Sequence, residues 1–94
     1  MNALSSDEIK KELTALDSWT FEDDKLKKEF TFSDFKQALA FMVRVGFEAE
    51  AQGHHPEWFN VYNNVKIELS THDAGGKVTG KDIKLGKTID KISG

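Results

Sequence analysis

The sequence predicts an α+β domain, in which a four-stranded antiparallel sheet carries three helices on one face, in the order α-β-β-α-β-β-α. Residues 5–16, 33–52 and 79–92 show the apolar spacing of amphipathic helices. Two segments between these helices have the alternating pattern of hairpin strands. Strands paired through tight turns, instead of strict alternation of strands and helices, favour an antiparallel sheet with helices on one side.

The first helix is expected over about residues 5–16. Ser5 and Glu8 have the Ser-x-x-Glu spacing of a capping box, and an apolar stripe at helical spacing follows them. The first hairpin comes next, with apolar residues alternating on both sides of an acidic turn at residues 22–25. We expect Trp19, just before this hairpin, to lie in the core.

The second helix is unusually rich in apolar residues. Ser33 is its expected N-cap, and Gly53 and Pro56 are expected to end it. A helix that is apolar on more than one face is usually buried on more than one side, so we expect a second subunit to cover the additional face. The stripe expected to face the sheet is Phe35, Ala38, Leu39, Met42, Val45, Gly46 and Ala49, and the apolar residues expected outside it are Ala40, Phe41, Val43 and Phe47.

The second hairpin is expected to turn at residues 63–64, because asparagine tolerates positive φ. In the following strand, residues 65–71, the apolar residues Val65, Ile67 and Leu69 alternate with polar ones and are expected to face inward. Thr79 then caps the last helix, with Asp82 at its third position.

Length and composition narrow the possible functions. A chain of 94 residues with 38% hydrophobic residues can build one modest core, so we expect a single domain over residues 1–94. The formal net charge of −3 argues against direct nucleic-acid binding, and the absence of cysteine excludes thiol chemistry and disulfide scaffolds. No apolar run approaches the roughly 20 residues of a membrane span, and no signal-peptide pattern is visible. We expect a cytoplasmic protein without membrane contact.

The three histidines lie at the ends of predicted elements. His54 and His55 follow the second helix, His72 follows the last strand, and Glu50 precedes His54 by one helical turn. Because imidazoles give and take protons near neutral pH, these residues are candidates for a general acid–base site for a small molecule. The alternative is structural, with His55 capping the helix, Trp58 in the core and His72 at a solvated strand end.

Two other kinds of site fit the sequence less well. Glu50 and His54 have the i, i+4 spacing of metal ligands on one helix face, but adjacent histidines rarely point at one ion and no His-Glu-x-x-His motif is present. A nucleophilic enzyme would need a cysteine or a Gly-x-Ser-x-Gly elbow, and the sequence has neither. We therefore expect neither a metal nor a cofactor.

Residues 50–65, EAQGHHPEWFNVYNNV, carry a family pattern that continues through residues 69–73 to Thr79 and Asp82. From about Trp19 to its end, the chain resembles pterin-4a-carbinolamine dehydratase, also known as the dimerisation cofactor of a homeodomain transcription factor. The combination of His-His-Pro-x-Trp with a Thr-His pair at this separation is highly specific. The resemblance favours the acid–base interpretation of the histidines.

The resemblance implies an α+β fold that assembles as a homodimer or homotetramer. It implies a dehydratase that removes water from 4a-hydroxytetrahydrobiopterin to give quinonoid dihydrobiopterin, which recycles the pterin cofactor of aromatic amino-acid hydroxylases. The site residues that it implies are His54, His55, His72 and Glu50 for catalysis, with Gly53, Ser70, Thr71 and Asp73 at the pterin. We add Trp58 as an apolar wall for the flat pterin, with core packing as the alternative.

Two departures from the family pattern concern the site. Gly53 stands where many members carry Asn or Asp, and this removes a side chain that could contact the substrate. The stretch from His72 to Asp82 is one residue longer than the spacing in animal members, so Lys81 is left out of the predicted site.

The reaction suits these residue types, because it requires protonation of the departing C4a hydroxyl and removal of the N5 proton. We expect His54 and His72 to share these transfers, His55 to position the substrate, and Glu50 to accept a hydrogen bond from an imidazole. The alternative function is a non-catalytic binding module, since relatives serve as dimerisation partners of transcription factors. A scaffold has no need of three histidines, so the enzyme is favoured; a hydroxylase or transcription factor is a possible protein partner.

Overall fold

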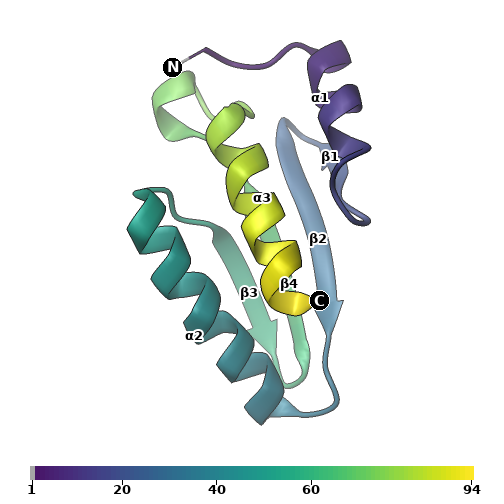
Figure 1. Cartoon of the computed structure of the whole chain (residues 1–94), viewed down its shortest axis with the longest axis vertical. Coiled ribbons are helices and arrows are strands. Elements are labelled where there is room, and N and C mark those ends of the chain that lie inside the picture. The colour runs from purple at the N-terminus through teal and green to yellow at the C-terminus, as the bar shows by residue number, and fades with distance from the viewer. Residues whose placement is uncertain (1) are drawn as a thin grey trace.

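The computed structural model describes residues 2–94 and confirms the predicted fold class and element order. Its sheet has the strand order β1-β2-β4-β3, and neighbouring strands are antiparallel (Figure 1). None of the helices in residues 2–94 is both long and apolar enough to span a membrane. The elements are α1 (Ser6–Leu13), β1 (Thr20–Glu22), β2 (Lys25–Thr31), α2 (Phe35–Gln52), β3 (Glu57–Val61), β4 (Asn64–Leu69), a short 3-10 helix η1 (His72–Ala74) and α3 (Gly80–Ser93).

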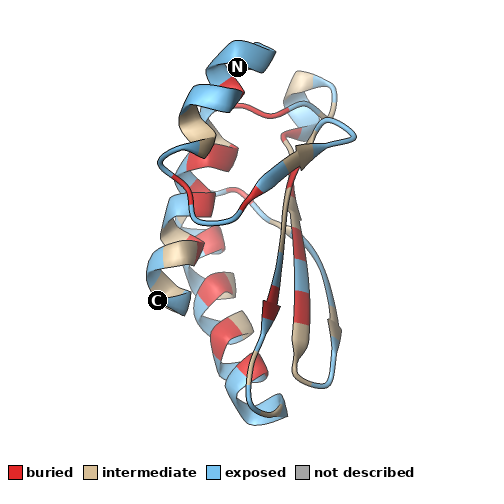
Figure 2. Cartoon of the chain, turned by 90° about the vertical axis from the view of Figure 1, so that its right-hand side faces the viewer, coloured by how far each residue is buried: buried red, intermediate tan, exposed pale blue. Residues whose placement is uncertain are grey.

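The helices cover one face of the sheet and leave the other face open (Figure 2). Val65, Ile67 and Leu69 on β4 face the helices and are fully buried, as their alternation predicts. Lys66, between them, is exposed on the open face. The core therefore lies in a single layer between the sheet and the helices.

The face that α2 turns to the sheet differs from the prediction. Phe41, predicted outside the inward stripe, is buried, and its ring centroid lies 4.9 Å from those of Phe30 and Phe32. Phe35 and Leu39, predicted to face the sheet, are exposed. The Phe41 ring thus packs between α2 and the sheet, next to Phe30 on β2 and Phe32 just after that strand. The exposed residues Phe35, Leu39, Val43 and Phe47 form one line along the helix, called here the α2 stripe.

Capping contacts set the helix ends. The capping box of Ser5 and Glu8 is present, as predicted. The N-cap of α2 is Asp34 and not the predicted Ser33, because the Asp34 carboxylate accepts the backbone N–H of Gln37 at 2.9 Å. Gly53 ends α2 with a left-handed backbone (φ 64°), as expected of a C-cap glycine.

The second hairpin turns one residue earlier than predicted. Its loop is Tyr62-Asn63, and Asn64 is already paired with Val61 as the first residue of β4. Side-chain amides hold this register: Asn60 donates to the Asn64 carbonyl at 2.9 Å and Asn63 to the Phe32 carbonyl at 2.8 Å. Tyr62 thereby takes a positive φ of 50°.

One charged residue points into the helix side of the sheet. The Nζ of Lys28 on β2 lies 2.8 Å from Oδ1 of Asp90 on α3, and the indole N–H of Trp19 donates to the same oxygen at 2.8 Å. Trp19 is buried as predicted. This network joins the last helix to β2 and to the segment before β1.

Candidate active site

A cavity of about 350 Å³ lies where the C-terminal end of α2, the start of β3, the end of β4 and the start of α3 meet. This volume is within the range of pockets that hold small ligands. Most of the predicted site residues line it, namely Gly53, His54, His55, Ser70, Thr71, His72 and Asp73. Pro56, Glu57 and Lys81 complete the lining.

Local backbone geometry brings the histidines to this cavity. At the end of α2, the N–H groups of Gly53 and His54 bond back to the carbonyls of Glu50 and Ala49, each at 3.0 Å. The left-handed backbone of Gly53 ends the helix, and the next two residues, His54 and His55, line the cavity. A Cβ built on Gly53 would have no neighbour within 4 Å, so a side chain at this position would meet open space.

His54 is buried and bonded to a buried carboxylate. Its Nε2 lies 2.5 Å from Oδ1 of Asp82 on α3, and Asp82 is fully buried. The second oxygen, Oδ2, accepts the Thr71 hydroxyl at 2.8 Å and the Thr79 backbone N–H at 2.9 Å. An ionised carboxylate acts only as an acceptor, so Nε2 of His54 is the donor to Oδ1 of Asp82.

A consistent direction of donation runs through the same network. The Lys81 N–H donates to Oγ1 of Thr79 at 3.2 Å, and the hydroxyls of Thr79 and Thr71 lie 2.8 Å apart. Since the Thr71 hydroxyl donates to Asp82, the Thr79 hydroxyl donates to Thr71. These donors all point towards Oδ2 of Asp82, while Oδ1 faces Nε2 of His54.

Asp82 was not predicted as a site residue. From the sequence, it is the third residue of a helix capped by Thr79, and the structure confirms that capping box. The same carboxylate also bonds His54, which lies 28 positions earlier in the chain. The family pattern in the sequence does extend to Asp82, but the capping box alone explains that residue, so its contact with His54 was not predicted.

His55 and Glu50 form a separate pair on the surface. Nε2 of His55 lies 2.7 Å from Oε1 of Glu50, and both side chains are exposed. Glu50 therefore meets an imidazole, although it does not line the cavity itself. His72 sits in η1, is exposed, and has no side-chain hydrogen bond among residues 2–94.

Trp58 lies outside the cavity, closer to the packing alternative stated above, and Lys81 lies inside it. Trp58 does not line the histidine cavity; its ring tip lies 3.8 Å from a Cβ built on Gly46 of α2, on the helix side of β3. Lys81, left out of the predicted site, does line the cavity. Its position on the first turn of α3 brings it there.

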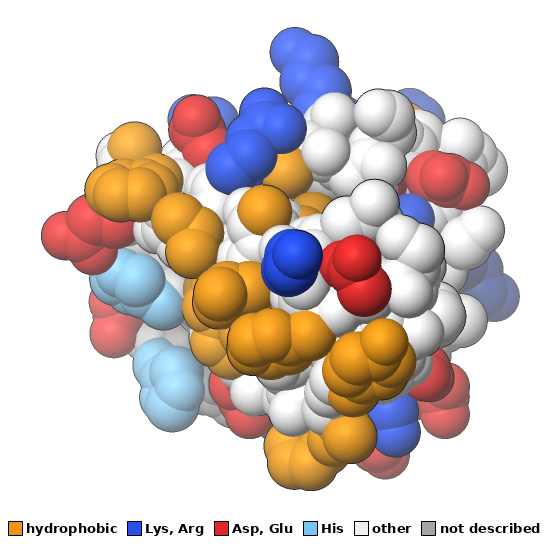
Figure 3. Space-filling view, turned by 90° about the horizontal axis from the view of Figure 1, so that it is seen from below, with side chains coloured by type: hydrophobic (Ala, Val, Ile, Leu, Met, Phe, Trp, Pro, Cys, Tyr) orange, Lys and Arg blue, Asp and Glu red, His pale blue; other side chains and the backbone are white. Residues whose placement is uncertain are grey.

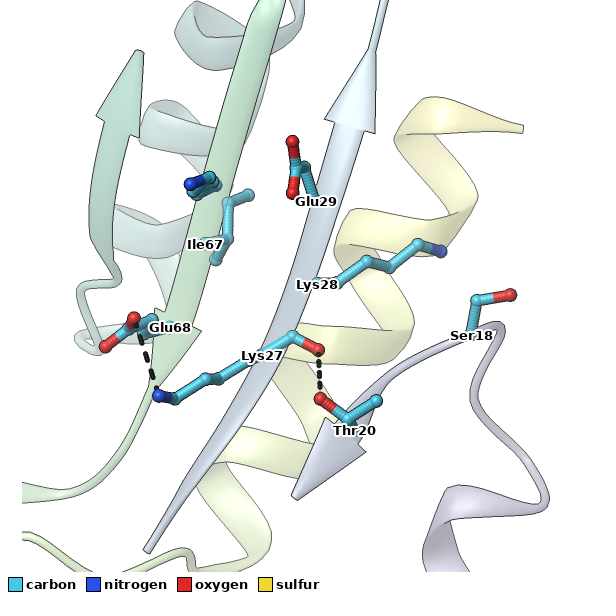
Figure 4. A pocket seen from close by; sticks show the side chains of 8 residues that line it. Ser18, Thr20, Lys27, Lys28, Glu29, Ile67 and Glu68 are labelled. Carbon is cyan, nitrogen blue, oxygen red and sulfur yellow. Dashed lines mark hydrogen bonds and ion pairs between the residues drawn. The ribbon is translucent and has the colours of Figure 1, made fainter. Parts of the chain in front are cut away.

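A second hollow, of about 360 Å³, lies on the open face of the sheet (Figure 4). Its lysines and glutamates lie close to one another; Nζ of Lys27, for example, is 3.9 Å from Glu68. The Thr20 hydroxyl donates to the Lys27 carbonyl at 3.4 Å. The hollow has no histidine in its lining, so the residues suited to proton transfer near neutral pH are those of the first cavity.

Comparison with known proteins identifies the family to which this combination of fold and histidine cavity belongs. The profile of the family described as pterin 4 alpha carbinolamine dehydratase matches residues 2–92. The chain belongs to this family. Relatives assigned to it include a protein of Opitutus terrae, 51% identical over 96% of this chain and 93% of its own length. Another, from Christiangramia forsetii, is 50% identical over 98% of this chain and 94% of its own.

A solved structure of the dehydratase family has the same fold. It is a transcriptional coactivator/pterin dehydratase from Brucella melitensis, 40% identical in sequence, and it superposes with a TM-score of 0.94. The match covers 99% of this chain and 100% of the other. The resemblance stated from the sequence motifs is thus confirmed at the level of the family and the fold.

Proposed function

We propose that this chain removes water from 4a-hydroxytetrahydrobiopterin, giving quinonoid dihydrobiopterin and so recycling the pterin cofactor of aromatic amino-acid hydroxylases. The observation that carries the proposal is that His72 and the Asp82-bonded His54 line one cavity in a chain of the dehydratase family. In the reaction the C4a–O bond breaks and the hydroxyl leaves as water after protonation. The N5–H bond also breaks, and its electron pair forms the C4a=N5 double bond.

The two proton transfers are proposed for His54 and His72. His54 is held by Asp82 with its proton on Nε2, so Nδ1 is the nitrogen left to exchange a proton with a ligand. His72 has both ring nitrogens free of side-chain partners among residues 2–94. Two imidazoles of this kind can serve as acid and base near neutral pH without a covalent intermediate.

His55 and Glu50 are proposed to position the substrate. Their side chains bond to each other at 2.7 Å at the rim of the cavity. The bond to Glu50 orients the His55 imidazole through Nε2, so its second nitrogen, Nδ1, is the one that can contact the substrate. Gly53, Ser70, Thr71 and Asp73 are proposed as further contacts to the pterin, and they lie in the lining of the cavity.

We also propose that the protein assembles as a homodimer or homotetramer. Two exposed apolar surfaces support this: the α2 stripe, in which Phe47 is 74% exposed, and strand β3, in which Phe59 is 63% exposed. Apolar side chains gather in a band across the lower end of the molecule (Figure 3). Exposed apolar patches of this kind mark interaction sites in soluble proteins. One self-complementary surface gives a dimer and two give a tetramer.

A second candidate function is a binding module for a transcription factor. It is favoured by the exposed α2 stripe and by the coactivator role stated for the Brucella melitensis structure. Freshly prepared 4a-hydroxytetrahydrobiopterin separates the two candidates, because its decay can be followed by stopped-flow absorbance. Faster decay with protein than without it supports the dehydratase, and equal rates leave the binding module.

A further inference from the structure

Strand β3 is an unprotected edge of the sheet. It pairs with β4 on one side only (Figure 1), and Phe59 and Val61 on it are 63% and 58% exposed. Edge strands are normally protected by lysine, proline or a bulge. This strand, Glu57–Val61, contains neither lysine nor proline, and its pairing with β4 is continuous. Such an edge is suited to pairing with an identical strand of a second copy.

The hairpin fixes which backbone groups are free on that edge. Val61 and Asn64 close a two-residue loop and form its hydrogen-bonded pair, and bonded pairs alternate with non-bonded ones along an antiparallel ladder. Residues 57, 59 and 61 therefore bond to β4, and the N–H and C=O groups of Trp58 and Asn60 point away from it. These are the groups available to a second copy.

A two-fold pairing that overlaps the whole strand with itself is centred on Phe59. It sets Trp58 opposite Asn60 of the partner subunit, so both residues with free backbone groups are used. It also sets Phe59 opposite its own copy, which forms an aromatic cross-strand pair, and Glu57 opposite the partner subunit's Val61, which keeps the two acids apart. Both the free backbone groups and the side-chain pairs therefore favour the register centred on Phe59.

In this register Tyr62 of the partner subunit reaches the histidine cavity. It follows Val61, so it comes beside Pro56, the residue before Glu57, and both Pro56 and Glu57 line the cavity. No Phe, Tyr or Trp from residues 2–94 of the same chain lines that cavity. A flat bicyclic pterin gains from an aromatic ring against its face, and the chain does not supply one to its own site.

The backbone of Tyr62 gives independent support. Its φ of 50° is left-handed, a conformation that is costly for a large side chain and that hairpin loops normally give to glycine or asparagine. The side chain is 60% exposed, so packing within the chain does not explain the choice of residue. Strained residues of this kind cluster at ligand sites.

We propose that, in a dimer joined through β3, Tyr62 of the partner subunit closes the histidine cavity and packs its ring against the bound pterin. The proposal rests on the proposed dehydratase function for the identity of the ligand. In such a dimer, residues of both subunits form each site, so the cavity of a single subunit is incomplete.

Disulfide trapping tests the position of Tyr62 without any use of activity. The chain has no cysteine, so introduced thiols are the only ones present. Phe59→Cys should form a disulfide between copies, because Cα atoms of a non-hydrogen-bonded pair lie about 4.5 Å apart. Lys66→Cys, on the same face but one strand away, is the matched control and should not. The double variant Pro56→Cys/Tyr62→Cys should link copies, whereas each single variant should not, since identical residues are about 20 Å apart.

Kinetics test the role of the ring. Tyr62→Gly removes the ring and relieves the left-handed backbone, so the melting temperature should stay equal or rise while kcat/KM falls about 3- to 10-fold, mainly through KM. Tyr62→Phe keeps the ring and should have a kcat/KM several-fold higher than that of Tyr62→Gly. A purely structural role would lower the melting temperature together with kcat/KM.

Heterodimers of two different variants test whether Tyr62 acts in the site of the partner subunit or in the site of its own subunit. In heterodimers of His72→Ala and Tyr62→Gly chains, one of the two sites has both an intact histidine and an intact tyrosine. Random mixing should therefore restore about one quarter of wild-type activity. Failure of the mixture to exceed the sum of the parents, or failure of the double-cysteine variant to link copies, would overturn the proposal. A wild-type chain without dehydratase activity would contradict the proposed function instead, and the trapping result would still decide where Tyr62 lies.

Discussion

Nε2 of His54 donates to Oδ1 of Asp82 across 2.5 Å, between the end of α2 and the start of α3. The carboxylate is fully buried, and its other oxygen accepts from Thr71 and Thr79. Asp82 therefore caps α3 and orients an imidazole at the same time. The helix cap and the cavity share one residue, so stability and activity are coupled there.

Asp82→Asn is expected to damage activity more than stability. The amide keeps one oxygen, which accepts from Thr71 and Thr79, and its NH2 group then faces Nε2 of His54. The proton of His54 therefore moves from Nε2 to Nδ1, which is the wrong tautomer. We expect kcat to fall by about 10²-fold or more and the free energy of unfolding to fall by about 1–3 kcal/mol. Stopped-flow kinetics and denaturant unfolding measure the two effects. Nitrogen chemical shifts of His54 that match wild type would contradict the tautomer argument.

His55→Ala is expected to raise KM more than it lowers kcat. His55 is exposed and paired only with exposed Glu50, which suits substrate positioning better than proton transfer. Glu50→Gln should have a smaller effect of the same kind, because an exposed pair contributes little. Steady-state kinetics of both variants check this. A drop in kcat for His55→Ala as large as that for His54→Ala would assign His55 to proton transfer.

Activity is expected to survive exhaustive chelation. The proposed transfers use imidazoles alone, and no group of three or more His, Asp or Glu side chains in residues 2–94 is arranged to hold a metal ion. The measurement is kcat/KM before and after EDTA treatment and dialysis. Loss of activity that zinc restores would replace the acid–base mechanism with metal-assisted chemistry.

Phe47→Asp and Val43→Asp are expected to weaken assembly. Each places a carboxylate on the α2 stripe, and an unpaired buried charge costs about 3–5 kcal/mol. Light scattering at micromolar concentration should show smaller species for these variants than for wild type. Arg44→Asp, on the same helix but outside the stripe, is the matched control and should assemble normally. A wild-type chain that scatters only as a 10.6 kDa species would contradict self-association.

Helix and strand periodicity predicted the element order correctly, because those patterns depend on neighbours in the sequence. The cap of α2 was placed one residue too early, because Ser33 and Asp34 are both good N-cap residues and Asp34 is the one that bonds Gln37. The hairpin loop was misplaced because a contact between distant segments takes part: the Asn63 amide reaches Phe32 of the preceding connection. Phe41 was assigned to the wrong face of α2, because several faces of that helix are apolar.

The candidate site was predictable where motifs carry it and not where the tertiary structure creates it. The three histidines share one cavity, as their positions at element ends suggested. The pairing of Asp82 with His54 depends on how α2 and α3 pack, and no local pattern encodes that packing. Trp58 remains outside the cavity because it faces α2.

In the proposed mechanism His54 and His72 carry the two proton transfers, and the double variant His54→Ala/His72→Ala is the sharpest test of these roles. Each single variant should lower kcat by about 10²–10⁴-fold, and the double variant should lose little beyond the worse single one, because paired groups act as a unit. The uncatalysed dehydration must be subtracted in every case. A double variant that folds, assembles and is no faster than this background supports proton transfer by the two histidines. One that folds, assembles and keeps near-wild-type kcat/KM would contradict it and leave the binding module as the function.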